Sequence, residues 1–267
     1  MHTKTFIICI IFVSLSCNSN NVYSTNAKKE SQVILSNDIN PYRGINEIPL
    51  PHGFTRTQSD PGSFAAWLLN VKLKKDKMVY KFDGTPKANQ NAQFAVMDIS
   101  VGDQDLQQCA DAVMRLRAEY LFAVKKYEDI HFTDNGGTVY QFYAPHTDKN
   151  LHQFLQKVFG RCGSASLAKQ LKGTAFNDIK PGDVLIRGGF PGHAVIVMDV
   201  AINSNGKKIY LLAQSYMPAQ DIHVLINPAN NLLSPWYEAD DAALVETPEY
   251  TFTKKELKKW PEIISLR

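Results

Sequence analysis

The chain has 267 residues, of which 44% are hydrophobic and 21% are charged, a composition typical of a globular protein that buries a core. Its formal net charge of +3 is too small to indicate a nucleic-acid-binding surface or a polybasic membrane surface. We therefore expect no nucleic-acid partner, and other partners have to be inferred from motifs.

The N-terminus predicts a bacterial lipoprotein signal. Residues 1–17 contain Lys4, an apolar block at 6–12, and the small Ser16 directly ahead of Cys17. The apolar block is too short to span a bilayer, which favours an export signal with lipidation at the cysteine. In the alternative, the signal is cleaved nearby without lipidation and leaves a soluble periplasmic product.

Residues 18–40 are predicted to form a flexible tether, because their first part, NSNNVYSTNAKKE, is polar and lacks periodicity. A lipid on Cys17 would hold the protein in the cell envelope, facing the periplasm, and the lipid anchor would be its only membrane contact. Asn18, in place of the Asp that is associated with inner-membrane retention, favours the outer membrane. Residues 41–267 are predicted to be a single α+β domain with an N-terminal extension and an insertion around 127–160.

The first half of this domain is rich in predicted helices. In chain order we expect a helix at 63–71, strands at 78–82 and 94–99, a long helix at 105–126, a hairpin at 135–137 and a helix at 151–159. In the long helix, Asp105 and Gln108 are spaced as an N-cap and its third-position partner, which would put Cys109 at the end of the first turn. Lys125 and Lys126 lie at its C-terminal end, where positive charge is favoured.

Strands dominate the second half. We expect a short helix at 166–171, strands at 183–186, 193–200, 209–215 and 221–225, and a charged helix near 254–260. The sequence Asn-Ser-Asn-Gly at 203–206 predicts a hairpin between the second and third of these strands. Helices followed by antiparallel strands indicate an α+β fold in which helices pack on a sheet.

Two cysteines remain after removal of the signal and lipidation, namely Cys109 and Cys162. In an exported protein they could form a disulfide, and otherwise each is a candidate nucleophile. Cys109 is the first candidate, because the free N–H groups at the start of a helix stabilise a thiolate and offer an oxyanion site. Cys162, in GRCGSASL ahead of a short helix, is the second. An inert, buried thiol is the alternative for Cys109.

His193 follows a Gly-Gly-Phe-Pro-Gly turn and begins an apolar strand, a position suited to a ring that faces a partner across a cleft. Amide hydrolysis by cysteine needs a base that takes the thiol proton and a third group that holds the tautomer of the base. Gln214, on the paired strand, is the candidate third group, and Tyr216 and Trp236 are candidates for lining the cleft. In the alternative, His193 is a loop histidine whose hydrogen bonds are all made and Gln214 is a hydrogen-bonded strand end. Tyr216 and Trp236 are then core residues.

We expect no metal and no cofactor. The histidines are scattered, without the H-x-x-x-H or C-x-x-C spacing of metal sites. The glycines at 188–189 belong to a turn between strands and not to a phosphate-binding loop at a helix start.

The stretch IKPGDVLIRGGFPGHAVIVMDV resembles the second half of the cell-wall cysteine peptidases of the NlpC type, a compact branch of the papain-like superfamily. Pro-Gly-Asp at 181–183 and Gly-His at 192–193 match the family's motif. The resemblance implies a papain-like fold, catalytic roles for Cys109, His193 and Gln214, and a peptidoglycan fragment or peptide as substrate. At 108–111 the chain has Gln-Cys-Ala-Asp, where the family has Asp-Cys-Ser-Gly.

A second resemblance covers most of the mature chain. The stretches DLQQCADAVMRLRAEYL, GHAVIVMDV and LLAQSYMPAQDIHVL, behind the signal, resemble a family of bacterial lipoproteins classed as a domain of unknown function. Two hypotheses follow: a lipid-anchored envelope cysteine hydrolase acting on peptidoglycan stem peptides, or a non-catalytic envelope lipoprotein that uses a papain-like scaffold as a binding module.

Overall fold

The computed structural model describes residues 39–240 and 242–262. The predicted signal with Cys17, and nearly all of the predicted tether at 18–40, lie outside the described residues. Within the part of the chain that is described, no helix combines the length and the apolar character that crossing a bilayer requires.

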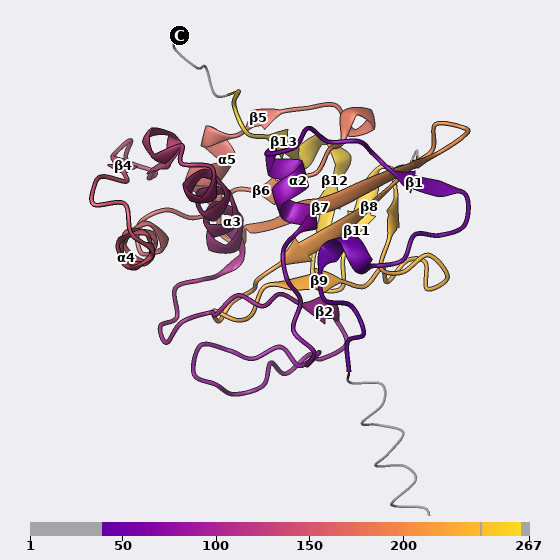
Figure 1. Cartoon of the computed structure of the whole chain (residues 1–267), viewed down its shortest axis with the longest axis horizontal. Coiled ribbons are helices and arrows are strands. Elements are labelled where there is room, and N and C mark those ends of the chain that lie inside the picture. The colour runs from indigo at the N-terminus through magenta and orange to yellow at the C-terminus, as the bar shows by residue number, and fades with distance from the viewer. Residues whose placement is uncertain (1–38, 241, 263–267) are drawn as a thin grey trace, which may run out of the picture. The chain divides into compact units, whose positions relative to one another are not determined.

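The described residues contain four α-helices, three of which gather at one end of the sheet (α3, α4 and α5 in Figure 1). They are α2 (Phe64–Leu69), α3 (Cys109–Ala123), α4 (Asp148–Phe159) and α5 (Ser164–Gln170). Short 3-10 helices are η1 (Ile45–Glu47), η2 (Tyr127–Asp129), η3 (Phe176–Asp178) and η4 (Lys254–Glu256). The helices predicted at 63–71, 151–159 and 166–171 are confirmed, with ends shifted by a few residues.

The long helix α3 begins later than the sequence predicted. Asp105 is not its N-cap, because Oδ1 of this residue accepts hydrogen bonds from the backbone N–H of Ala219 and from Nε2 of Gln108. The N-cap is Gln108, whose backbone N–H donates to Oδ2 of Asp111 at 3.0 Å. Cys109 is therefore the first residue of the helix, where the backbone N–H groups are free of helical partners.

A large antiparallel sheet of nine strands lies at the centre of the described residues (Figure 1). Its order is β2-β9-β8-β7-β6-β13-β5, with β1 beside β7 and β10 beside β8. The strands are β1 (Phe54–Arg56), β2 (Gln93–Val96), β5 (Lys172–Gly173), β6 (Val184–Arg187), β7 (His193–Asn203), β8 (Lys208–Gln214), β9 (His223–Leu225), β10 (Tyr237–Glu238) and β13 (Leu257–Lys259). Two separate hairpins pair β3 (His131–Thr133) with β4 (Val139–Gln141), and β11 (Leu244–Glu246) with β12 (Thr251–Thr253). The predicted α+β class is confirmed.

The longest strands, β7 and β8, form the predicted hairpin around residues 203–206. Oδ1 of Asn203 accepts hydrogen bonds from the backbone N–H groups of Asn205 and Lys207, which closes the turn. The register shifts by one residue between Val197 and Asp199. This bulge brings the far ends of the two strands, which carry His193 and Gln214, into side-chain contact.

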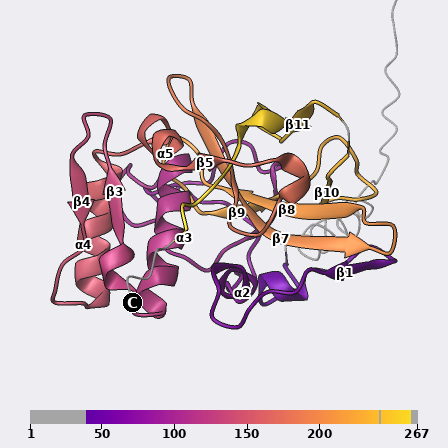
Figure 2. The same ribbon diagram turned by 90° about the horizontal axis from the view of Figure 1, so that it is seen from above.

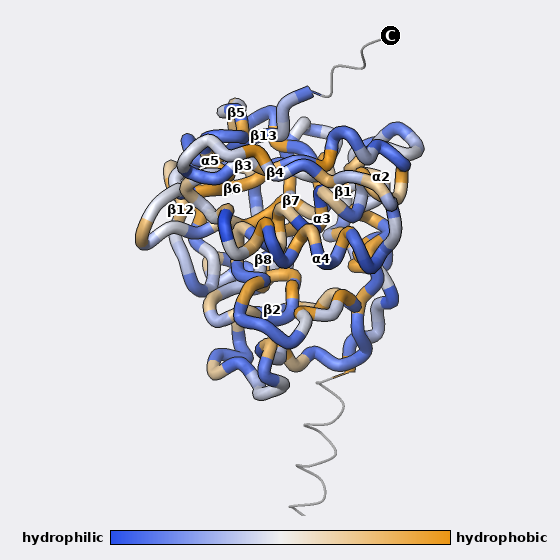
Figure 3. The backbone as a smooth tube through the Cα atoms, turned by 90° about the vertical axis from the view of Figure 1, so that its left-hand side faces the viewer, coloured by the Kyte–Doolittle hydropathy of each residue, from blue (hydrophilic) through white to orange (hydrophobic). Residues whose placement is uncertain are grey.

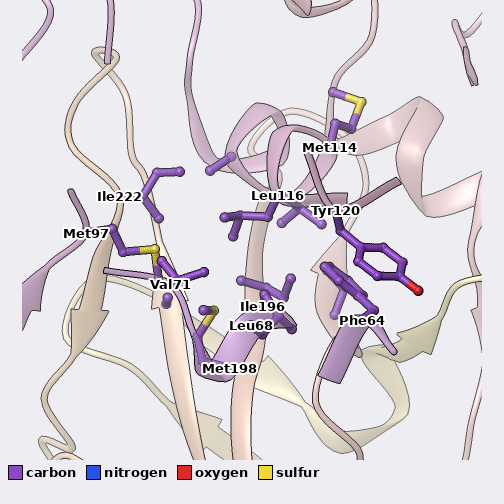
Figure 4. Packing of buried hydrophobic residues seen from close by; sticks show 14 of the residues in the cluster. Phe64, Leu68, Val71, Met97, Met114, Leu116, Tyr120, Ile196, Met198 and Ile222 are labelled. Carbon is purple, nitrogen blue, oxygen red and sulfur yellow. The ribbon is translucent and has the colours of Figure 1, made fainter. Parts of the chain in front are cut away.

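The two faces of the sheet pack against different elements. Figure 2 shows α2 and the β11–β12 hairpin on opposite sides of β7 and β8. Alternate residues of β7 divide accordingly, since Ile196 and Met198 join the core under α2 and α3, while Val195 and Val197 join the core under the hairpin. Figure 3 shows hydrophobic residues concentrated along β7 and β8. Figure 4 shows side chains of α2, α3 and β7 packed together.

The predicted insertion around 127–160 spans η2, the β3–β4 hairpin and all of α4. It contributes Phe132, Phe142 and Leu155 to the same core that buries the inner face of α3. Since these side chains are almost fully buried, the segment is an integral part of the packing around α3.

Two predicted elements are wrong. The helix predicted near 254–260 is instead the short η4 followed by β13, because β6 offers an open edge with which Leu257 and Lys258 pair. The strand predicted at 78–82 makes isolated bridges, from Tyr80 to Pro86 and from Lys81 to Gln220, and no continuous ladder.

Candidate active site

One open cleft, of about 420 Å³, contains the predicted nucleophile, its rival and the predicted base. Its walls come from the segment that leads into α3, the start of α5, the loop between β6 and β7, and the residues after β8. Cys109, Cys162 and His193 all line it, and both cysteines are free thiols. The disulfide considered from the sequence is therefore not formed.

Cys109 is partly exposed at the N-terminal end of α3. Burial and, to a smaller extent, the nearby carboxyl of Asp111 raise the pKa of its thiol to about 11, although the backbone N–H groups of Ala194 and Ala110 act to lower it. The thiol thus lies against the backbone of the strand that His193 begins. At neutral pH it keeps its proton.

His193 is the first residue of β7 and is only 3% exposed. Its Nε2 is 2.8 Å from Oε1 of Gln214, and its ring lies 4.9 Å from the ring of Tyr216 and 5.0 Å from that of Tyr250. Burial lowers the pKa of the imidazole to about 4, so the ring is neutral at neutral pH. With Nε2 engaged by Gln214, Nδ1 is the nitrogen available to a thiol.

The glycines ahead of His193 allow the loop to press against the start of α5. A Cβ on Gly192 would lie 2.3 Å from Oγ of Ser164 and 2.4 Å from the carbonyl oxygen of Gly189. A Cβ on Gly188 would meet Ala165 and Ala168 at 3.1 and 3.0 Å. The glycine-rich turn is therefore required by close packing, which in turn places the first residue of β7 at the cleft.

Behind Gln214 lies a polar network that the sequence analysis did not identify. Nε2 of Gln214 donates a hydrogen bond to Oε2 of Glu249 at 2.7 Å, and Nζ of Lys87 lies 2.6 Å from the same oxygen. Buried His223 lies opposite Gln214 on β9. Glu249 and Lys87 are 162 residues apart in the chain, so no local pattern could have revealed their pairing.

The two predicted aromatic residues have different positions. Tyr216 lines the cleft beside His193. Trp236 does not line it: its side chain is 1% exposed in the main core, and its Nε1 donates a hydrogen bond to the carbonyl oxygen of Pro49. A predicted contact of Trp236 with substrate is therefore wrong.

Cys162 occupies the same cleft from the loop before α5. Its side chain is buried, and burial raises the pKa of its thiol to about 11, with Asp134 and Asp111 adding to the effect. Cys162 precedes α5 by two residues and so lies outside the helix, whereas Cys109 is the first residue of α3. The geometry favours Cys109 as the nucleophile.

The rim of the cleft is apolar. Phe190, on the loop before His193, is 97% exposed, and Met217, after β8, is 62% exposed. Among the described residues that line the cleft, the charged side chains are those of Asp105 and Asp111, and none is Lys or Arg. Across residues 39–240 and 242–262, no group of three or more His, Cys, Asp or Glu side chains is arranged to hold a metal ion.

The fold and the cleft define an α+β protein in which a helix-starting cysteine and a strand-starting histidine line one cleft at the end of a large antiparallel sheet. The chain belongs to the family described as domain of unknown function 4846, which it matches over residues 45–149 and 139–259. No curated protein matches the chain, and no solved structure does. The expectation of a family of unknown function is confirmed, and the matched residues do not include the predicted signal.

Proposed function

We propose that this protein is a cysteine hydrolase that cleaves amide or peptide bonds in the bacterial cell envelope. The observation that carries the proposal is the cleft shared by Cys109 and His193, with the amide of Gln214 at the far nitrogen of the ring. The resemblance to NlpC-type peptidases supports it, because their nucleophile also begins a helix and their histidine and third residue lie on successive strands. The packing of α3 against β7 is compatible with the papain-like fold that we propose.

The reaction begins from a neutral pair, since the pKa of the thiol is about 11 and that of the imidazole about 4. The thiol proton of Cys109 passes to Nδ1 of His193 as the sulfur attacks the substrate carbonyl. A carbon–sulfur bond forms, and the carbonyl oxygen takes up the electron pair. The free N–H groups at the start of α3 can stabilise that oxyanion.

The tetrahedral intermediate then expels the amine. The carbon–nitrogen bond breaks, and the imidazolium of His193 gives its proton to the leaving nitrogen. Water attacks the remaining thioester with His193 as the base, which releases the acid and returns the proton to Cys109. Gln214 holds Nε2 of the ring throughout.

Peptidoglycan stem peptides are the proposed substrates, on the strength of the NlpC-type resemblance. A lipid on Cys17 would hold the enzyme at the outer membrane with the cleft facing the periplasm. Because the described lining of the cleft contains no Lys or Arg, a carboxylate next to the scissile bond would lack a cationic partner. We expect the segment beside the scissile bond to be apolar or amidated.

Mass spectrometry of purified stem peptides incubated with the protein tests the proposal. Wild type and the matched control Cys162→Ala should release the same fragments, while Cys109→Ala should lose activity by about a thousandfold or more. Undiminished cleavage by Cys109→Ala would exclude this residue as the nucleophile, and inactivity of Cys162→Ala alone would assign the role to Cys162.

A non-catalytic binding module is the second candidate. It is favoured by the high pKa of both thiols, about 11, which leaves little thiolate at neutral pH. Incubation of the folded protein with stem peptides at pH 7 separates the two candidates. Cleavage that Cys109→Ala abolishes supports the hydrolase, whereas binding of stem peptides that remain uncleaved supports the module.

A further inference from the structure

We propose that the buried ion pair of Glu249 and Lys87 sets the tautomer of His193, acting through the side-chain amide of Gln214. Glu249 is then a positioning residue for the candidate active site. The tautomer itself is independent of any activity, and only its consequence for turnover rests on the proposed hydrolase function.

The ion pair supplies a fixed hydrogen-bond acceptor. Glu249 lies in the turn between β11 and β12, and its Oε2 is 2.6 Å from Nζ of Lys87. Its other oxygen accepts a hydrogen bond from Nδ2 of Asn89 at 3.2 Å. The side chains of Glu249 and Lys87 are only 13% and 7% exposed, and the two groups form a salt bridge. An ionised carboxylate accepts hydrogen bonds and cannot donate them.

This acceptor decides which way the amide of Gln214 points. The amide atom that lies 2.7 Å from Oε2 of Glu249 has to be the nitrogen, because only the NH₂ group can donate to a carboxylate. If the amide were turned by half a revolution, two acceptor oxygens would face each other in a buried site. Glu249 therefore directs Oε1 of Gln214 toward His193.

A second neighbour is compatible with the same orientation, across a longer distance. Nδ1 of His223 is 2.9 Å from the carbonyl oxygen of Asp221, which can only accept, so Nδ1 of this ring carries the hydrogen. Nε2 of His223 then presents a lone pair 3.5 Å from Nε2 of Gln214. Burial lowers the pKa of His223 to about 3, which keeps the ring neutral.

The orientation of the Gln214 amide determines the tautomer of His193. Since Oε1 of Gln214 faces Nε2 of His193 at 2.8 Å, that nitrogen has to carry the hydrogen, and Nδ1 carries the lone pair. Nδ1 is the atom that takes the thiol proton of Cys109 in the proposed reaction. In the opposite tautomer Nδ1 would already be protonated, and the ring could not act as the base.

The test is a long-range proton–nitrogen NMR spectrum of the protein labelled with ¹⁵N-histidine at pH 7. Wild type should show His193 with the hydrogen on Nε2 and His223 with the hydrogen on Nδ1. In the paired variant Lys87→Met with Glu249→Met the acceptor is absent and no buried charge is left, so the ratio of Nδ1–H to Nε2–H at His193 should rise about tenfold or more. The control Glu246→Gln, an exposed residue on β11, should leave the ratio unchanged.

An Nδ1–H tautomer of His193 in the wild type, or an unchanged ratio in the folded paired variant, would overturn the inference. The far-UV circular dichroism spectrum reports whether the paired variant is folded. If it does not fold, the tautomer of His193 in the wild type decides alone, because the Nδ1–H form would contradict the inference.

Activity provides a separate readout. If the protein hydrolyses stem peptides, the paired variant should lower kcat about tenfold and leave KM unchanged. A wild-type protein with the expected tautomer but no hydrolysis would refute the hydrolase function and leave the tautomer assignment intact.

Discussion

Asp111 lies two residues after Cys109 in the first turn of α3, and its buried carboxyl raises the pKa of the Cys109 thiol. Oδ2 of Asp111 accepts the backbone N–H of Gln108, whereas Oδ1 has no hydrogen-bond partner among the described residues. Burial raises the pKa of Asp111 well above its usual range. A helix N-terminus favours a thiolate, and this carboxyl opposes that effect when it is ionised.

Replacing Asp111 with Asn should therefore make Cys109 more reactive. The amide oxygen can still cap Gln108, but the negative charge is gone, so the pKa of the thiol should fall from about 11. We expect alkylation by iodoacetamide at pH 8 to accelerate about three- to tenfold, because thiolate content rises tenfold for each unit of pKa. The measurement uses a background in which Cys9, Cys17 and Cys162 are replaced by Ala, so that only Cys109 contributes. An unchanged rate would show that Asp111 has no electrostatic influence on the thiol.

The buried histidines should make stability depend on pH. Burial lowers the pKa of His193 to about 4 and that of His223 to about 3, from an ordinary value of 6.5. Between the folded-state pKa and 6.5, each ring is protonated in the unfolded chain and neutral in the folded chain. The free energy of unfolding therefore falls as the pH decreases below 6.5, by about 1.4 kcal/mol per ring and pH unit. Asp183 and Asp199, whose pKa burial raises to about 6, act in the opposite direction, since their contribution is present at low pH and lost as pH rises through 6.

A difference measurement isolates the contribution of His193. The free energy of unfolding in urea is measured at several pH values between 4.5 and 6.5 for wild type and for His193→Asn. The aspartates and His223 are the same in both proteins, so the slope with pH should be smaller in the variant by about 1.4 kcal/mol per pH unit. Equal slopes would mean that His193 is not held neutral by burial.

The loop ahead of His193 should tolerate no side chain at Gly192. A Cβ there meets two backbone carbonyl oxygens, of Gly189 and Arg187, at 2.4 and 2.8 Å, so Gly192→Ala should destabilise the protein by about 1–3 kcal/mol. Thermal unfolding measures the loss. At Gly173, on β5, a Cβ has no atom within 4 Å, and Gly173→Ala should leave the midpoint within experimental error. Equal midpoints for both variants would contradict the close packing.

Local patterns in the sequence predicted the elements that carry the candidate site, for physical reasons. The strands of His193 and Gln214 are long apolar runs joined by an Asn-Gly turn, and each of these signals acts over a few residues. The helix of Cys109 was predicted from its pattern, but its start was misplaced by four residues. Asp105, the predicted N-cap, is instead held by Ala219, a residue far along the chain.

What the sequence did not predict depends on distant partners. The residues at 257–259 form a strand because the edge of β6 is open to them, a fact of topology and not of local propensity. Trp236 was assigned to the cleft, but an aromatic residue has the same local signature in a core as at a cleft wall. Glu249 and Lys87 come together only in the folded chain, so no local pattern in the sequence could predict the network behind Gln214.

The apolar rim should contribute to substrate binding and not to folding. Phe190 is 97% exposed and lines the cleft, so Phe190→Ala removes little buried area from the folded protein, and stability should change by less than about 0.5 kcal/mol. An apolar substrate group placed against this ring loses its contact, and kcat/KM for such a substrate should fall about tenfold. Leu232→Ala is the matched control, because Leu232 is equally exposed but does not line the cleft, and both its stability and its kcat/KM should equal those of wild type. A Phe190→Ala variant with undiminished kcat/KM would show that the substrate does not reach this side of the cleft.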